Sequence, residues 1–259
     1  NDQVVAIEQT SAGYHRAKAK NMPFPIINVA RANIKLTQES SFITRMICRK
    51  AEEAISKFFL DTSDLKILVL GGGAIGSDVQ KNIEKRHKTD IFDLQTTLSD
   101  ISSDNFDLRL VQYDVFIGCT GNCSIPKEKH KLLKPGSLLI SASSSDREFD
   151  CVELRKNLPV YSYCHKTIQS QGVFLLNSGF PVNFDETYLD STELQLTRSL
   201  LLSAIGQALK TSPSRALDTF IPLENTEKIS QRYKRLFPTT QIGNSLKSPH
   251  EIEFSPEAI

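Results

Sequence analysis

The chain has 259 residues, a length that suits one large domain or two modest ones at roughly 150 residues per domain. Its 31 Lys and Arg residues against 30 Asp and Glu residues give a formal net charge of +1, which argues against a basic nucleic-acid groove. Hydrophobic residues make up 39% of the chain, enough for a globular core, but the apolar runs are far shorter than the ~20 residues that span a bilayer. We therefore expect no nucleic-acid or membrane partner.

Five scattered cysteines suit reduced thiols better than a disulfide framework. Cys119 and Cys123 are four residues apart, as in some metal sites, but the second pair that such a site needs is absent. Cys164 and His165 do not supply it, because neighbouring side chains on a strand point to opposite faces. We predict buried or half-buried thiols, no metal and a cytoplasmic protein. Because the chain opens on Asn1 and not on Met, the absence of a targeting segment counts for little.

The first sixty residues contain one clear helical pattern. From about Gln38 to Leu60 apolar residues recur at steps of three and four, which predicts an amphipathic helix. Before it, Phe24–Val29 predicts a short extended segment, and the rest of the first forty residues shows mixed patterns. The apolar positions of the helix are Ile43, Met46, Ile47, Ala54, Ile55, Phe58 and Phe59.

Short apolar segments alternate with helical ones in the rest of the chain. The expected strands are Lys66–Leu70, Thr89–Phe92, Asp114–Cys119, Ser137–Ala142, Val160–Cys164 and Val173–Asn177. The expected helices are Ala74 to about His87, Lys127–Leu133, Ser191–Lys210 and Thr226–Leu236. This alternation is typical of an α/β fold with a doubly wound, Rossmann-like parallel sheet.

The first of these strands runs directly into Gly71-Gly72-Gly73-Ala74-Ile75-Gly76, which fits the pattern G-x-G-x-x-G. A helix follows, and Asp93 ends the next strand 17 residues after Gly76, the context that dinucleotide binding requires. Gly71 would allow the tight turn, Gly73 the approach to a pyrophosphate, and Gly76 the close packing of helix and strand. Asp93 would bind a ribose diol and repel a 2′-phosphate, which favours NAD over NADP. The alternative is a glycine-rich turn without a ligand.

A second loop follows the strand at Asp114–Cys119, where ligands of doubly wound sheets lie. Thr120, Gly121 and Asn122 could present a hydroxyl and free backbone N–H groups to a cofactor. An ordinary turn is the alternative, and the sequence does not decide between the two.

Six short segments carry a resemblance to a known family: Ile7–Gly13, Pro25–Val29 leading to Lys35, the glycine loop, Cys119–Gly121, Asp146–Asp150 and Gly179–Asn183. Their order and approximate spacing resemble those of the S-adenosylhomocysteine hydrolase family over most of the chain. The resemblance implies an NAD domain beside a substrate domain, to which the chain returns after the NAD domain. We expect a remnant of the substrate side at 1–45, the NAD domain at 46–184 and a helical return segment at 185–259. Much of the family's first segment has no counterpart, so we expect a fragment or a reduced relative.

The resemblance also implies a chemistry. In the family, NAD oxidises a ribose 3′-hydroxyl, so that a base can remove the neighbouring C4′ proton and the thiol can leave. The family's catalytic lysine falls on Lys35, and the aspartate four residues later falls on Glu39. Without the resemblance, Lys35 would be one surface lysine among many. The family positions that can still bind NAD are Thr10, Ser11, Thr120, Gly121 and Asn183.

Most of the family's other acid and base positions are not retained. The glutamate of the first segment falls on Gln9, with Glu8 adjacent, and the two histidines fall on Ser144 and near Asp190. The asparagine of the lysine segment falls on Ser40, and the C-terminal Lys-x-x-x-Tyr tail is absent. We therefore expect an NAD-dependent redox enzyme that acts on a hydroxyl of a small nucleoside- or sugar-like substrate. The alternative is a non-catalytic NAD-binding regulatory or scaffolding protein.

The helix at Ser191–Lys210 predicts assembly. Its apolar face is wider than one neighbouring helix covers. One part of this face should pack on the Gln38–Leu60 helix near Phe58 and Phe59, and the rest of the face should mark an interface. We expect a homo-oligomer with a two-fold contact, or else a helix wholly inside one subunit's core. The apolar residues are Leu194, Leu200, Leu201, Leu202, Ile205 and Leu209.

Overall fold

The computed structural model describes residues 4–20, 22–143, 146–156, 158–159, 165–184, 191–212 and 219–238. Six strands form its larger sheet, in the order β4-β3-β5-β6-β8-β7. Every neighbouring pair is parallel except β7 and β8, which form an antiparallel hairpin. The strands are β3 Lys66–Leu70, β4 Lys88–Phe92, β5 Val115–Gly118, β6 Leu138–Ser141, β7 Ile168–Ser170 and β8 Val173–Leu175.

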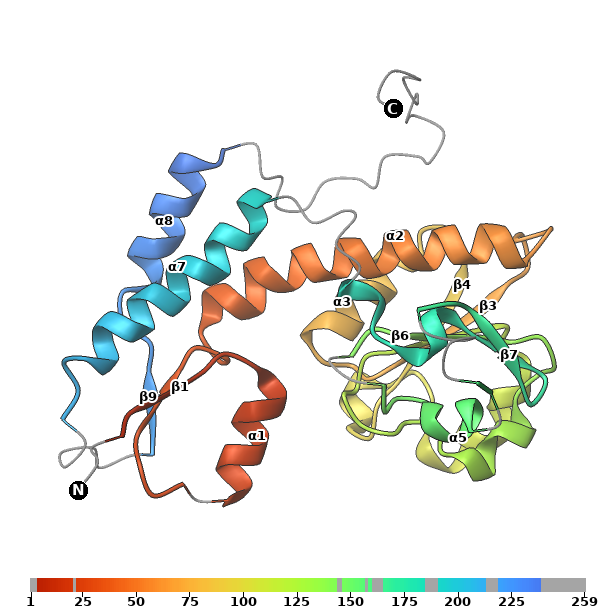
Figure 1. The fold of residues 1–259 in the computed structure, drawn as a ribbon. Helices are drawn as coiled ribbons and strands as arrows, with labels where there is room; N and C mark the ends of the chain where they lie inside the picture. Colours follow the sequence, from red (N-terminus) through yellow and green to blue (C-terminus); the bar gives the residue numbers. More distant parts are fainter. Residues whose placement is uncertain are drawn as a thin grey trace.

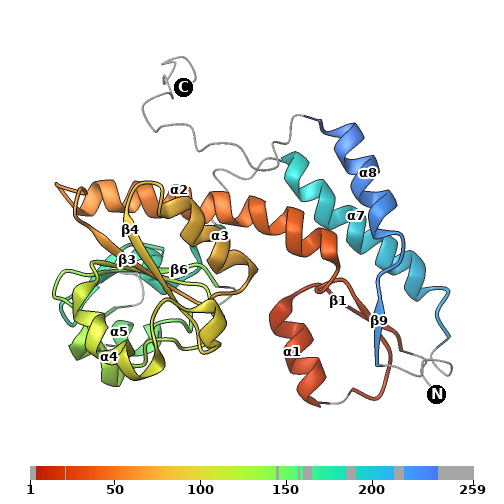
Figure 2. The ribbon, with the colours of Figure 1, turned by 180° about the vertical axis from the view of Figure 1, so that it is seen from behind.

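Helices cover both faces of this sheet, so its central strands are apolar on both sides. In β3, Ile67 and Val69 pack under α2 (Ser40–Phe58) and α3 (Ala74–Ile83). Leu68 and Leu70 face α4 (Phe106–Arg109) and α5 (Cys151–Arg155) on the other side. Figures 1 and 2 show the sheet between these two layers. The expected doubly wound, Rossmann-like α/β sheet is confirmed.

The expected elements differ from the structure mainly at their ends. The helix after the glycine loop ends at Ile83 instead of about His87, and the segment Lys127–Leu132 is a 3-10 helix. The expected strand Val160–Cys164 lies outside the described residues. The hairpin strand β7 was missed, because a three-residue strand is too short to show a period.

A second, smaller sheet contains strands from the N-terminal and the C-terminal parts of the chain. It is parallel, in the order β1-β2-β9, and helix α1 (Ser11–Lys20) connects β1 to β2. The C-terminal segment is therefore not helical throughout, because β9 pairs with β2 beside α7 (Ser191–Ala208) and α8 (Thr226–Leu236). The strands are β1 Ala6–Glu8, β2 Ile26–Asn28 and β9 Phe220–Pro222.

Helix α2 connects the two sheets, as Figure 1 shows. At its start Phe42 packs in the core of the small sheet, and further along Ile47 and Ile55 pack in the core of the large sheet. A π-helical turn, Lys35–Glu39, leads directly into α2. The expected boundary between residues 45 and 46 falls inside this helix.

Helix α7 buries only Leu200 of the expected apolar residues, together with Leu196 and Ala204, and it packs on the small sheet instead of on Phe58 and Phe59. Leu196, Leu200 and Ala204 are buried in the small-sheet core. Phe58 and Phe59 do not meet α7, because they pack on the core of the large sheet. An apolar stripe on α7 is exposed, and the homo-oligomer stays a prediction. The exposed residues are Leu194, Leu202, Ile205 and Leu209.

The described part of the chain contains no helix that is both long and apolar enough to cross a membrane. Within the same part, no three His, Cys, Asp or Glu side chains lie close enough together to hold a metal ion. The cysteines that the structure describes are free thiols: Cys48, Cys119, Cys123 and Cys151.

Candidate functional site

The strand order reverses beside β3, which pairs with β4 on one side and with β5 on the other. The loops that leave the carboxyl ends of β3 and β5 therefore lie next to each other. A Cβ atom on Gly71 would lie 3.1 Å from the Thr120 backbone nitrogen, so the two loops are in contact. This is the place where doubly wound sheets bind their ligands.

The three motif glycines of the loop differ in backbone conformation and in the atoms around them. Gly71 has φ +98°, a conformation that other residues rarely adopt. A Cβ atom on Gly76 would lie 1.8 Å from the Gly71 carbonyl oxygen, because helix and strand pack closely there. Gly73 has no neighbouring atom within 4 Å of its Cβ position, and Ala74 beside it is exposed. The start of α3 is therefore open to a ligand at Gly73, while Ile75 packs into the core.

Asp93 ends β4 next to this loop. One carboxylate oxygen accepts the Gly72 N–H at 2.6 Å, and the other accepts the Gln95 N–H at 2.8 Å. The carboxylate is thus held at the edge of the glycine loop, half-buried, where an acceptor for a ribose diol is required.

The buried carboxylate of Glu148 anchors the second loop, which contains Thr120, Gly121 and Asn122. The Gly121 N–H, the Thr120 hydroxyl and the Ser124 hydroxyl all donate to this carboxylate, at 2.5, 2.9 and 3.0 Å. The Thr120 hydroxyl and the Gly121 N–H thus point to Glu148 inside the protein and not toward the glycine loop. Asn122 turns back on the same loop, donating its N–H to the Thr120 hydroxyl.

Burial raises the pKa of the Glu148 carboxyl above its ordinary value of 4.5, although the hydrogen bonds from Gly121, Thr120 and Ser124 oppose the shift. The sequence placed Glu148 only inside the segment Asp146–Asp150 and assigned it no role. An acidic residue in a short loop has no distinguishing pattern, and its burial follows from the fold alone.

The N-terminal candidate residues lie at the carboxyl end of β1. The Thr10 N–H and hydroxyl donate to Glu8 at 2.6 and 2.8 Å, and the Gly13 N–H donates to the Thr10 hydroxyl. The Glu8 carboxylate therefore accepts hydrogen bonds at the start of α1, of which exposed Ser11 is the first residue. The Gln9 side-chain oxygen is buried and has no hydrogen-bond partner among the described residues.

Lys35 and Glu39 form an ion pair across the π-helical turn that precedes α2. Their side chains are only 17% and 14% exposed, so Lys35 is not an ordinary surface lysine. The Thr197 hydroxyl of α7 donates to the other Glu39 oxygen at 2.8 Å. Insertions of this helix type occur frequently at functional sites.

Asn183 lies beyond the carboxyl end of β8, in the turn Val182–Phe184. Its side-chain oxygen is buried without a hydrogen-bond partner in the described part of the chain. The structure thus brings the glycine loop, Asp93 and the Thr120 loop together. Among the described residues, no hydrogen bond or ion pair joins Thr10, Lys35 or Asn183 to that group.

Two surface cavities lie away from the glycine loop. One of about 330 Å³ lies between the end of α7 and the turn before α8, and its lining is polar and includes Gln207 and Asn225. The other, of about 180 Å³, lies beside α2 and includes Lys50 and Asn177. Neither contains a residue of the glycine loop.

The fold defines an α/β protein with a Rossmann-like parallel sheet. The comparisons with known proteins add the following. No protein-family model matches the sequence. Two curated proteins of Mycobacterium tuberculosis, described as uncharacterized proteins MT0113 (strain CDC 1551) and Rv0104 (strain H37Rv), are each 40% identical over 209 residues. The match covers 78% of this chain and 40% of each relative, so the chain spans about two fifths of their length.

Several solved structures are similar to this chain at low identity. The dipicolinate synthase A chain from Bacillus subtilis is 10% identical, with a TM-score of 0.47, over 80% of this chain and 66% of that chain. The NADPH-dependent glyoxylate/hydroxypyruvate reductase from Sinorhizobium meliloti is 13% identical, with a TM-score of 0.44, over 78% and 76%. We draw no functional conclusion from similarity at this level.

Proposed function

We propose that the two adjoining loops at the carboxyl ends of β3 and β5 bind NAD. The observation that carries the proposal is the open backbone at Gly73, where nothing within 4 Å would meet an added Cβ, at the start of a ten-residue helix. Gly73, Ala74 and Ile75 would hold the pyrophosphate at the positive end of α3. Asp93 would hold the adenosine ribose, and no lysine or arginine lies in the following segment Leu94–Asp100 to pair with a 2′-phosphate.

This proposal predicts that the protein binds NAD more tightly than NADP in calorimetric titration. Asp93→Ala should weaken NAD binding by about 1–2 kcal/mol, the scale of hydrogen bonds to a charged acceptor. Asp64→Ala is the matched control, since Asp64 is an exposed aspartate paired with Lys88 at the other end of the sheet. Tighter binding of NADP by the unaltered protein would contradict the assignment.

We further propose that the whole protein is an NAD-dependent redox enzyme related to the S-adenosylhomocysteine hydrolase family, with a small nucleoside- or sugar-like substrate. NAD, when bound, supplies a hydride acceptor. The Lys35–Glu39 pair places a carboxylate, which can accept the proton that a substrate hydroxyl loses, beside a lysine in one half-buried position. The Thr197 hydroxyl holds Glu39 from α7, so the pair is fixed between two helices.

Incubation with nucleosides and NAD, followed by NADH fluorescence, tests this role. Lys35→Ala should lower the rate about hundredfold, in the range of a general acid or base. Lys88→Ala, which removes an exposed lysine at the start of β4, should leave the rate unchanged. If the protein binds NAD but no nucleoside or sugar reduces it, the non-catalytic regulatory alternative replaces the enzyme proposal.

A further inference from the structure

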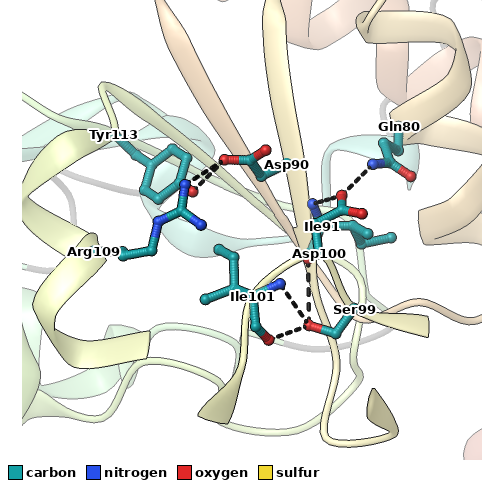
Figure 3. Close-up of polar contacts among 8 residues, drawn as sticks. All are labelled: Gln80, Asp90, Ile91, Ser99, Asp100, Ile101, Arg109 and Tyr113. Carbon is teal, nitrogen blue, oxygen red and sulfur yellow. Dashed lines mark hydrogen bonds and ion pairs between the residues drawn. The ribbon is translucent and has the colours of Figure 1, made fainter. Parts of the chain in front are cut away.

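The segment between Asp93 and Ile101 is folded back along the outer edge of β4. The Asp100 N–H donates to the Ile91 carbonyl oxygen, and the Ile91 N–H donates to an Asp100 carboxylate oxygen, both at 2.9 Å. This reciprocal pair continues the hydrogen bonding of the sheet beyond its edge strand. Figure 3 shows Asp100 lying between β4 and Gln80 of α3.

The same Asp100 oxygen also accepts the Gln80 side-chain amide at 2.8 Å. One carboxylate therefore connects the returning segment with β4 and with the helix that starts at the glycine loop. The Ser99 hydroxyl bonds to the Ile101 carbonyl oxygen at 2.7 Å within the segment, and it lies 3.4 Å from the Ile91 carbonyl oxygen of β4. At the other end Asp93 accepts the Gly72 and Gln95 N–H groups, so the segment Leu94–Leu98 is anchored at both ends.

This fixed segment lies against the glycine loop. A Cβ atom on Gly72 would lie 2.6 Å from the Leu98 carbonyl oxygen and 2.7 Å from the Leu98 Cβ atom. Leu98 is nevertheless 39% exposed, and Leu94, directly after Asp93, is 84% exposed. Two apolar side chains thus remain open to solvent beside the carboxylate that would hold the adenosine ribose.

We propose that Asp100 is a positioning residue for the adenine end of a bound dinucleotide. It holds the segment Leu94–Leu98 so that the two leucines cover an apolar face of the base while Asp93 binds the ribose. The ligand class is a purine nucleotide with a ribose diol and a pyrophosphate. The inference rests on the proposed NAD site and adds the residue that sets the geometry of its adenine end.

Three variants test the inference. Asp100→Ala removes the acceptor of both the Ile91 N–H and the Gln80 amide. Asp100→Asn is the matched control, because one oxygen accepts both bonds and an amide oxygen can replace it. Gly72→Ala should displace Leu98 by a steric clash from the glycine loop, while the hydrogen bonds of Asp100 stay in place.

The probe is 1,N6-etheno-NAD, whose fluorescence arises from the modified adenine. Asp100→Ala should weaken its binding about tenfold, the change expected for a lost hydrogen-bonded anchor, and should also alter the emission of the saturated complex. Gly72→Ala should shift the emission in the same direction, and Asp100→Asn should match the unaltered protein in both readouts. Unchanged affinity of Asp100→Ala, or weaker binding with unchanged emission at saturation, would overturn the positioning role. If the unaltered protein binds neither the probe nor NAD, the proposed function itself fails.

Discussion

Gly76→Ala is expected to destabilise the fold by about 3 kcal/mol or more, the upper range for inserting atoms into a packed site. The added Cβ atom would lie 1.8 Å from the Gly71 carbonyl oxygen and 3.0 Å from the Gly71 carbonyl carbon. Both are backbone atoms, so no side-chain rotation relieves the clash, and α3 must move away from β3. Urea denaturation should show a lower midpoint. An unchanged midpoint would mean that this packing is looser than the structure shows.

Gly73→Ala is the matched control three residues earlier. Its backbone has φ −66° and ψ −177°, which alanine adopts without strain, and the added atom meets nothing within 4 Å. Stability should stay within about 0.5 kcal/mol of the unaltered protein. NAD binding should nevertheless weaken, because the methyl group would occupy the approach to the pyrophosphate. Normal NAD binding by Gly73→Ala would remove the pyrophosphate from this position.

Glu148→Ala is expected to have the second large effect, a destabilisation of about 3 kcal/mol. The Gly121 N–H would lose its acceptor at 2.5 Å, and the Thr120 hydroxyl would lose the carboxylate beneath it. Glu148→Gln keeps one accepting oxygen and the side-chain volume, so it should be destabilised less. Denaturation midpoints of the three proteins measure the order. A Glu148→Ala protein as stable as the unaltered one would show that the loop does not depend on this carboxylate.

The same carboxyl group makes stability depend on pH. Burial raises its pKa in the folded protein above the ordinary value of 4.5. Between the two pKa values the folded state holds more protons, so the free energy of unfolding should fall as pH rises through that window. Glu148→Gln cannot titrate and should lack this part of the fall. Identical pH profiles of the two proteins between pH 4.5 and neutrality would contradict the raised pKa.

The large sheet was accessible from the sequence because its signals are local. Strand β3 is a continuous apolar run, the glycines follow it directly, and Asp93 ends the next strand. A turn with positive φ at Gly71 and a close contact at Gly76 depend on residues within a few positions of each other, so a short pattern can represent them.

The small sheet was not accessible in the same way. The extended segment expected at Phe24–Val29 contains β2, but the three-residue strands β1 and β9 are too short to show a period. In addition, β2 pairs with β9, which is nearly two hundred positions away. The sequence does not show which apolar residues of α7 are buried, for a related reason. Apolar residues occur all round that helix, so only the position of β2 and Phe42 decides that Leu196 and Leu200 are buried.

By itself the sequence determined the alternation of strands and helices, the glycine loop and the acidic residue that follows β4, since each signal is local in the chain. Only the tertiary structure decided that Glu148 holds the Thr120 loop, that Thr197 holds Glu39, and that Asp100 ties its segment to β4 and α3. Each of these contacts joins a polar side chain to groups on other elements. A polar residue in a loop or on a helix has the same local pattern whether it meets solvent or a buried partner, so its role appears only when the fold brings that partner to it.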